Sequence, residues 1–152
     1  MRLALFEPDI PQNLGAFIRL SACLGAPLDV IEPCGFPVDD KRIRRAAMDY
    51  YDLANITRHA SWKAFQRDRM PGRLVLLTTA GAMRFPDVNF RPDDTLLLGR
   101  ESAGVPAEVH EAADLRLRIP LQKSLRSLNV ATAAAMVLGE ALRQTNGYTA
   151  LT

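Results

Sequence analysis

Short apolar runs alternate along this chain with longer amphipathic segments, and this alternation limits the folds that the sequence can adopt. The runs at 73–79 and 95–98 show no polar alternation, which is typical of strands buried on both faces. Strands that alternate with helices predict an α/β domain whose mostly parallel sheet has helices on both faces. We expect strands over residues 2–7, 28–32, 53–57, 73–79, 95–98 and 114–119.

Helix signals fall between these strands. Gly25 is a plausible stop for the first helix, Ser61 is a good N-cap, and Pro106 suits a first helical turn. The last helix carries an alanine-rich stripe at helical spacing, which fits either core packing against the sheet or a dimer face. The stripe consists of Val130, Ala133, Ala134, Val137, Leu138, Ala141 and Leu142. The predicted helices span residues 13–24, 40–48, 61–68, 106–113 and 129–143.

Length and composition favour one globular domain over residues 1–152. Apolar residues make up 48% and charged residues 24% of the chain, which excludes a disordered chain. Cys23 and Cys34 are too few for a disulfide scaffold, so we expect buried thiols in a reducing compartment. The sequence has neither a signal peptide nor the run of about 20 apolar residues that a membrane helix needs. We therefore expect a soluble cytoplasmic protein with no membrane partner.

Three polar segments follow predicted strands, at the edge where parallel sheets bind ligands. Residues 11–19 contain a possible helix cap, Asn13, and a glycine that permits close backbone approach. Residues 98–106 place a charged Arg-Glu pair between two glycines. Residues 119–129 lead into the last helix, which Ser127 or Asn129 can cap. Each segment suits a ligand-binding loop, and each is also compatible with an ordinary capped turn.

Several common site types are missing from the sequence. It contains no GxGxxG, GxxxxGK[ST] or GxSxG motif, which excludes the familiar dinucleotide, P-loop and nucleophile-elbow signatures. His59 and His110 are far apart and no CxxC or HExxH spacing occurs, so we expect no metal site.

Positive charge gathers in three groups: Arg67, Arg69 and Arg73, then Arg116 and Arg118, and most densely on one short predicted helix. It carries Lys41, Arg42, Arg44 and Arg45, with Tyr50, Tyr51 and Trp62 not far away in the sequence. Such a cluster is either a solvated helix face or a surface that follows nucleic-acid phosphates, with aromatic side chains as stacking platforms.

Taken together and in this order, the segments NLGAFIR, LGRESAGVP and IPLQKSLRSLN resemble the three motifs of the SpoU branch of SPOUT RNA 2′-O-methyltransferases. The whole chain, including FPVDDKRIRRAAMDYYD, resembles the minimal TrmL-type members, which methylate the wobble ribose of certain leucine tRNAs. The resemblance implies a carboxyl-terminal trefoil knot, S-adenosyl-L-methionine as cofactor, and a homodimer whose active site is shared across the interface.

The resemblance also implies roles for individual residues. Arg19 matches the family's catalytic arginine, and Asn13, Glu101 and Asn129 match the polar residues around it. Because guanidinium normally keeps its proton, Arg19 is either unusually desolvated or it orients the hydroxyl while another group accepts the proton. The tRNA anticodon stem-loop is expected on the basic cluster at 41–45. The cofactor contacts are expected at Leu77, Thr78, Gly99, Ile119, Ser127 and Leu128.

Two positions depart from the family pattern. Relatives often have an aromatic residue at the position of Gly139 and a serine at that of Ala131. Two alternatives stay open beside the wobble-ribose assignment. The chain either methylates another tRNA or rRNA site with the same chemistry, or it is a non-catalytic RNA-binding protein of the same fold.

Overall fold

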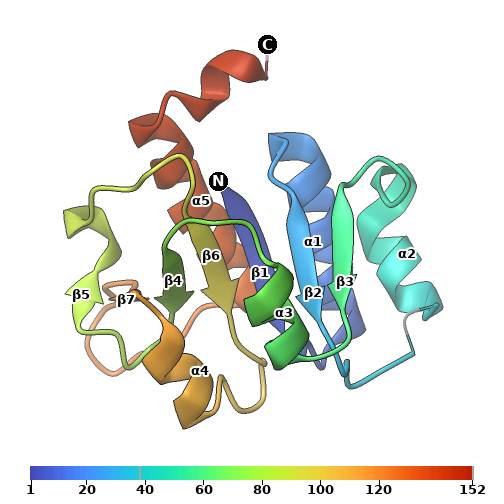
Figure 1. Cartoon of the computed structure of the whole chain (residues 1–152), viewed down its shortest axis with the longest axis horizontal. Helices are drawn as coiled ribbons and strands as arrows, with labels where there is room; N and C mark the ends of the chain where they lie inside the picture. The colour runs from blue at the N-terminus through green and yellow to red at the C-terminus, as the bar shows by residue number, and fades with distance from the viewer. Residues whose placement is uncertain (38, 152) are drawn as a thin grey trace.

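A computed structural model describes residues 1–37 and 39–151, and it confirms the predicted α/β class. The described residues form a seven-stranded sheet in the order β3-β2-β1-β6-β4-β7-β5, with every pairing parallel (Figure 1). The strands are β1 (Arg2–Phe6), β2 (Leu28–Ile31), β3 (Ile56–His59), β4 (Leu74–Leu77), β5 (Met83–Arg84), β6 (Thr95–Leu98) and β7 (Leu115–Arg118).

The register of the sheet brings the carboxyl ends of four strands to one edge. Leu98, the last residue of β6, pairs with Leu5 of β1 on one side and with Leu77 of β4 on the other. Leu77 in turn pairs with Leu117 of β7. The loops after these strands hold the three polar segments of the sequence, so the fold gathers them at this edge.

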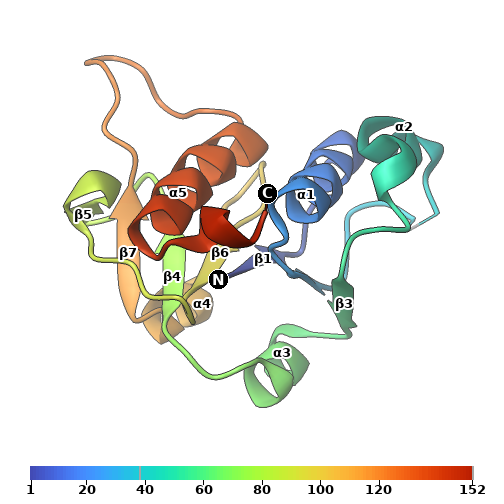
Figure 2. The ribbon, with the colours of Figure 1, turned by 90° about the horizontal axis from the view of Figure 1, so that it is seen from above.

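Helices cover both faces of the sheet, as predicted. On one face lie α1 (Pro11–Leu24), α2 (Lys41–Ala47) and α5 (Val130–Gln144), and on the other lie α3 (Trp62–Asp68) and α4 (Ala107–Ala112) (Figure 2). Side chains of β1 alternate between the two cores, with Leu3 and Leu5 on the α1 side and Ala4 and Phe6 on the α3 side. Three short 3₁₀ segments, η1 (Met48–Tyr50), η2 (Phe85–Asp87) and η3 (Gly147–Ala150), complete the named elements.

Most helix ends follow their sequence signals. Gly25 ends α1 with a left-handed φ of 61°, and the Ser61 hydroxyl accepts the Ala64 N–H at 3.1 Å to begin α3. Pro106 lies at the N-cap of α4 rather than inside its first turn. The predicted cap at Asn13 is wrong, because α1 begins at Pro11 and has no side-chain cap.

Two strand predictions are also wrong in detail. The strand expected at 53–57 lies at Ile56–His59, because the Leu53 N–H bonds the Tyr50 carbonyl at 3.1 Å and leaves Leu53 in a turn, 72% exposed. The two-residue β5 has no sequence signal of its own, since it is too short to show a period.

The expected burial of Cys23 is wrong. Its side chain is exposed, because α1 turns Leu14, Phe17 and Ile18 toward the core and leaves Cys23 outside. Cys34 is partly buried, and burial raises the pKa of its thiol to about 11. The idea of Trp62 as a stacking platform is wrong as well, since its ring is 7% exposed and packs edge-on against Phe6.

The stripe on α5 packs inside this chain, which confirms the core interpretation for most of its length. Ala134, Val137, Leu138, Ala141 and Leu142 are buried against the sheet and α1, whereas the first two residues of the stripe are only partly buried. A dimer face on α5 stays a prediction. Within residues 1–37 and 39–151, the helices are too short or too polar to cross a bilayer.

Candidate active site

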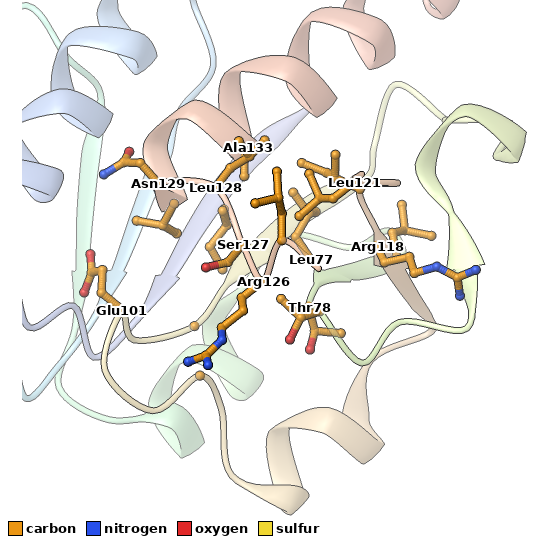
Figure 3. A pocket seen from close by; sticks show the side chains of 18 of the residues that line it. Leu77, Thr78, Glu101, Arg118, Leu121, Arg126, Ser127, Leu128, Asn129 and Ala133 are labelled. Carbon is orange, nitrogen blue, oxygen red and sulfur yellow. The ribbon is translucent and has the colours of Figure 1, made fainter. Parts of the chain in front are cut away.

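A cavity of about 790 Å³ opens at the carboxyl edge of the sheet, where β4, β6 and β7 end (Figure 3). Its walls come from the loops after these three strands, from the start of α1 and from the first turns of α5. All three polar segments of the sequence contribute to it. This edge is where open parallel sheets generally bind their ligands.

The structure brings together all six residues expected to contact a cofactor. They come from three loops that lie far apart in the sequence, and each of them lines the cavity: Leu77, Thr78, Gly99, Ile119, Ser127 and Leu128. The Thr78 N–H donates to the Leu117 carbonyl at 2.8 Å, while the Thr78 carbonyl accepts from the Gly81 N–H and its hydroxyl oxygen from the Ala80 N–H. The Thr78 hydroxyl can still donate its proton to a ligand. The lining combines apolar side chains with polar and charged ones from all three loops.

The loop at 119–129 forms the largest part of the wall and leaves most of its backbone polar groups free. Among the described residues, the backbone hydrogen bonds outside helices and strands give residues 120–128 a single bond, from the Leu125 N–H to the Gln122 carbonyl at 3.2 Å. Leu125 is 64% exposed and Leu128 is 39% exposed. A ligand in the cavity therefore finds both apolar surface and unpaired backbone donors and acceptors.

Glu101, Asn13 and Asn129 form a hydrogen-bonded chain along one wall. The Asn13 amide donates from Nδ2 to Glu101 Oε1 at 3.1 Å, and Asn129 donates from Nδ2 to Asn13 Oδ1 at 3.0 Å. Asn129 also begins α5, because its Oδ1 accepts the N–H groups of Ala131 and Thr132. These hydrogen bonds tie the three polar segments together and engage both the oxygen and the nitrogen of the Asn13 amide.

Asp9 lies behind this wall, in contact with Glu101, and the sequence interpretation missed it. Asp9 and Glu101 each donate a backbone N–H to the other's carboxylate, at 3.2 and 3.1 Å. The Ser102 hydroxyl also donates to Asp9. Burial, and then the interaction of its side chain with the Asp9 side chain, raise the pKa of Glu101, while the same side-chain interaction lowers the pKa of Asp9. The sequence signal that could have found Asp9 is its position, because it is a carboxylate in the loop after the first strand, directly before the segment that contains Asn13.

Position 99 requires glycine because a neighbouring backbone segment leaves no space for a side chain, and not because of an unusual backbone conformation. A Cβ at Gly99 would lie 2.6 Å from the Gly104 carbonyl carbon, because Arg100 and Gly104 form a tight pair of backbone hydrogen bonds. The loop after β6 therefore folds back on itself at a point where no side chain fits. Gly104 has a left-handed φ of 63° and open space around it.

Arg19 lies outside the cavity in a single chain. Its side chain is exposed on α1, where one guanidinium nitrogen is 3.1 Å from the Met48 sulfur and the group lies 5.6 Å from the Tyr50 ring centre. The structure does not bring Arg19 to Glu101, Asn13 and Asn129 within one protomer.

The basic cluster predicted at 41–45 forms most of α2. Arg42 pairs with Asp40 at 2.7 Å and Arg44 lies over the Tyr51 ring at 4.3 Å, whereas Lys41 and Arg45 extend into solvent. Helix α2 packs tightly on α1, where a Cβ at Gly15 would lie 2.5 Å from the Ile43 carbonyl oxygen.

Other cations, which the sequence interpretation did not single out as a group, surround the cavity. Five basic side chains belong to its walls: Arg84, Arg100, Arg118, Lys123 and Arg126. Arg118 also donates to the carbonyls of Gly81 and Ala82 at 3.0 and 3.1 Å. A cavity with this lining suits a ligand that combines a flat apolar part with negative charge.

Known proteins resemble this chain in both sequence and fold. Residues 1–139 match the model of the SpoU rRNA Methylase family. A tRNA (cytidine(34)-2'-O)-methyltransferase of Ancylobacter novellus is 59% identical, over 97% of this chain and 95% of that protein. The protein of the same name from Escherichia coli is 42% identical, over 95% and 93% of the two chains.

Solved structures resemble the fold just as closely. One, described as "Structural insights into the 2-OH methylation of C/U34 on tRNA", has a TM-score of 0.91 and 37% identity, covering 96% of each chain. The SpoU methyltransferase AviRb of Streptomyces viridochromogenes, in complex with AdoMet, has a TM-score of 0.83 and 29% identity over 95% of this chain and 60% of its own. The fold is that of the SpoU methyltransferases, with a carboxyl-terminal trefoil knot. Motifs and fold agree over nearly the full length, and the chain therefore belongs to the SpoU rRNA Methylase family.

Proposed function

We propose that this chain transfers a methyl group from S-adenosyl-L-methionine to the ribose 2′-hydroxyl of the wobble nucleotide, cytidine or modified uridine, of leucine tRNAs. The observation that carries the proposal is the cavity, in which six expected cofactor contacts lie beside the Glu101–Asn13–Asn129 chain. Relatives named for the 2′-O-methylation of cytidine 34 support the choice of substrate. The proposed substrate places the enzyme in the cytoplasm.

The residues of the cavity fit this cofactor. Leu77, Ile119 and Leu128 offer an apolar slot of the kind that an adenine ring fills, and the free backbone groups of the loop at 120–128 can bond its ring nitrogens. The basic side chains of the walls suit the cofactor's carboxylate and the phosphates of an RNA substrate. When bound, the cofactor supplies a methyl group already activated on a sulfonium, so the protein needs to align the reactants and handle one proton.

A second copy of this chain completes the proposed active site. Arg19 is exposed and lies outside its own cavity, so it is free to serve the cavity of a partner. Met136 on α5 and Tyr148 beyond it are both 43% exposed, and they leave apolar surface on the outer side of this helix. A homodimer that covers this surface would bring one protomer's α1 toward the other's active site.

The cations of α2 form the proposed tRNA contact. Lys41 and Arg45 extend into solvent, and the tight packing of α2 on α1 holds them close to the helix that carries Arg19. Phosphates of an anticodon stem-loop bound here would lie beside the proposed catalytic arginine. This cluster is better suited than Arg73 and Arg116, which are engaged by Asp94 and by the His110 carbonyl.

The test is transfer of a labelled methyl group from S-adenosyl-L-methionine to total tRNA from a strain that lacks this protein, followed by nucleoside mapping. We expect label on the 2′-oxygen of a wobble pyrimidine in leucine tRNA. Label at another ribose would keep the chemistry and overturn the substrate. An absence of label with every RNA offered, despite tight RNA binding, would favour the non-catalytic alternative.

A further inference from the structure

Arg19 differs from most arginines of this chain in the side chains that hold it. Among residues 1–37 and 39–151, no carboxylate lies within ion-pair distance of Arg19, which contacts the uncharged side chains of Met48 and Tyr50. In the same part of the chain, eight other arginines pair with a carboxylate: Arg2, Arg42, Arg58, Arg67, Arg73, Arg84, Arg100 and Arg143. The charge of Arg19 is therefore not neutralised within one protomer.

We propose that Met48 and Tyr50 are positioning residues for Arg19: they form an uncharged support that fixes the guanidinium and leaves its N–H groups for the RNA substrate. This role rests on the proposed function, in which Arg19 acts at the ribose hydroxyl. A carboxylate in the place of the support would hold the guanidinium more strongly. It would also compete with the oxygen atoms of the substrate for the same N–H groups.

The two contacts of the support differ in kind. Arg19 donates from Nη1 to the Met48 sulfur at 3.1 Å, and a thioether sulfur is a weak acceptor. The guanidinium carbon of Arg19 lies over the Tyr50 ring, 5.6 Å from its centre, which is within the range of a cation–π attraction. Tyr50 is half-buried, so its ring is itself held in place. The support thus orients the group while four of its five N–H donors keep no partner in the part of the chain that the structure describes.

The packing of α2 on α1 brings the support to Arg19. Gly15 and Arg19 lie one turn apart on the same face of α1. At Gly15 the two helices are in close contact, since a Cβ there would lie 2.5 Å from both the Ile43 carbonyl oxygen and the Ala46 Cβ (Figure 2). The chain passes directly from α2 into η1, which contains both residues of the support. The direction of Arg19 therefore depends on a rigid helix pair.

The backbone of Met48 is strained. Met48 ends α2 with a φ of 56° and a ψ of −143°, a combination that residues with a Cβ rarely adopt. Such conformations persist where the surroundings impose them, and they are frequent at functional sites. Met48 is 52% exposed, so burial in the core does not explain a methionine at a position that glycine would occupy without a steric penalty. The contact of its sulfur with Arg19 does explain it.

The test compares single-turnover rates of methyl transfer at saturating tRNA and cofactor, for the full chain and for matched pairs of variants. We expect M48Q and Y50F to stay within about threefold of the unchanged chain, because Gln offers an uncharged acceptor and Phe keeps the ring face. We expect M48E and Y50L to lose about tenfold or more in rate, because the carboxylate captures the guanidinium and Leu removes its platform. Filter binding measures tRNA affinity separately, and Y50L should keep a normal value.

The variant M48G separates the proposed role from a structural one. Glycine relieves the strain, so we expect the melting temperature to rise by about 2–4 °C, while the rate falls by about tenfold because the sulfur contact is lost. A residue that only stabilises the fold would not change the two quantities in opposite directions. N146G is the control, because Asn146 also has a φ of 56° but follows α5, and we expect its rate to be normal.

Three outcomes would overturn the proposal. Equal rates in M48E and M48Q would show that the charge of the neighbour does not matter to Arg19. A normal rate in Y50L with weakened tRNA binding would make Tyr50 a stacking platform for the RNA. A lower melting temperature together with a lower rate in M48G would reduce Met48 to a structural residue. If the unchanged chain transfers no methyl group to any RNA, the proposed function itself has failed, which is a distinct result.

Discussion

Asn129 Nδ2 donates a 3.0 Å hydrogen bond to Asn13 Oδ1, which joins side chains that lie 116 positions apart in the sequence. The same Asn129 side chain accepts two backbone N–H groups at the start of α5. One residue thus begins the last helix and fixes a side chain of the first. A helix cap and a contact on the cavity wall are combined in a single amide.

Replacing this residue should affect stability and activity together. We expect N129A to lower the free energy of unfolding by about 0.5–2 kcal/mol, as the loss of an N-cap does, and to reduce methyl transfer strongly. S61A is the matched control, since Ser61 caps α3 on the other side of the sheet. Chemical denaturation and transfer rates should show similar destabilisation in both variants but normal activity in S61A. Equal activity losses in both would show that the cap alone matters.

The loop after β6 gives a prediction about cofactor binding. G99A places a Cβ 2.6 Å from the Gly104 backbone, so the loop must open and the cavity wall must move. We expect S-adenosyl-L-methionine binding, measured by calorimetry, to weaken at least tenfold. G104A is the contrasting variant, because space surrounds that position and only its left-handed conformation is penalised, by about 1 kcal/mol. Tight binding by G99A would mean that the cofactor does not contact this loop.

Sharing of Arg19 between protomers can be tested with mixed dimers. R19A alone should bind cofactor normally and lose methyl transfer. Co-expression of R19A and E101Q with two different tags, followed by purification on both, yields heterodimers in which one of the two sites has all its residues if Arg19 acts across the interface. We expect about half of the normal activity in this preparation. If Arg19 serves its own chain, the heterodimer should be inactive.

Charge reversal on α2 should weaken tRNA binding. In K41E/R45E two exposed cations become anions, and we expect a lower affinity in filter-binding measurements. The slope of log affinity against log salt should fall by about 0.9 for each phosphate that the variant no longer neutralises. K63E is the control, because Lys63 is also exposed but lies on α3, across the sheet. Equal effects of both changes would indicate a non-specific loss of positive charge.

Local signals in the sequence predicted most of the fold, because each depends on a few neighbouring residues. Ser61 caps its helix and Gly25 ends its helix for reasons that lie within one turn of chain. The resemblance to a family then placed the cofactor contacts in three loops, and the structure brings all of these residues to one cavity.

Long-range pairing was beyond the reach of the sequence. Asp9 and Glu101 meet only because β1 and β6 are neighbours in the sheet. Neither segment contains a sequence signal that predicts its contact with the other. The departure at Gly139 is a second example. Tyr148 of η3 places its hydroxyl oxygen 3.2 Å from where a Cβ at Gly139 would lie. An aromatic side chain from η3 therefore lies beside the position at which relatives often have an aromatic residue. The surroundings of Gly139 depend on how the segment after α5 folds back onto this helix, which the hydrophobic periodicity of the sequence does not predict.

The position of β1 in the middle of the sheet has a consequence for synthesis on the ribosome. Arg2 pairs with Thr95 of β6, so the strand made first acquires this neighbour only after about 90 further residues have been added. At roughly 5–20 residues per second, the backbone N–H and C=O groups on one edge of β1 lack their β6 partner on the nascent chain for several seconds. During that interval the edge is a template for unwanted strand pairing. We expect newly made chains to need chaperone protection, although the finished sheet covers both edges of β1.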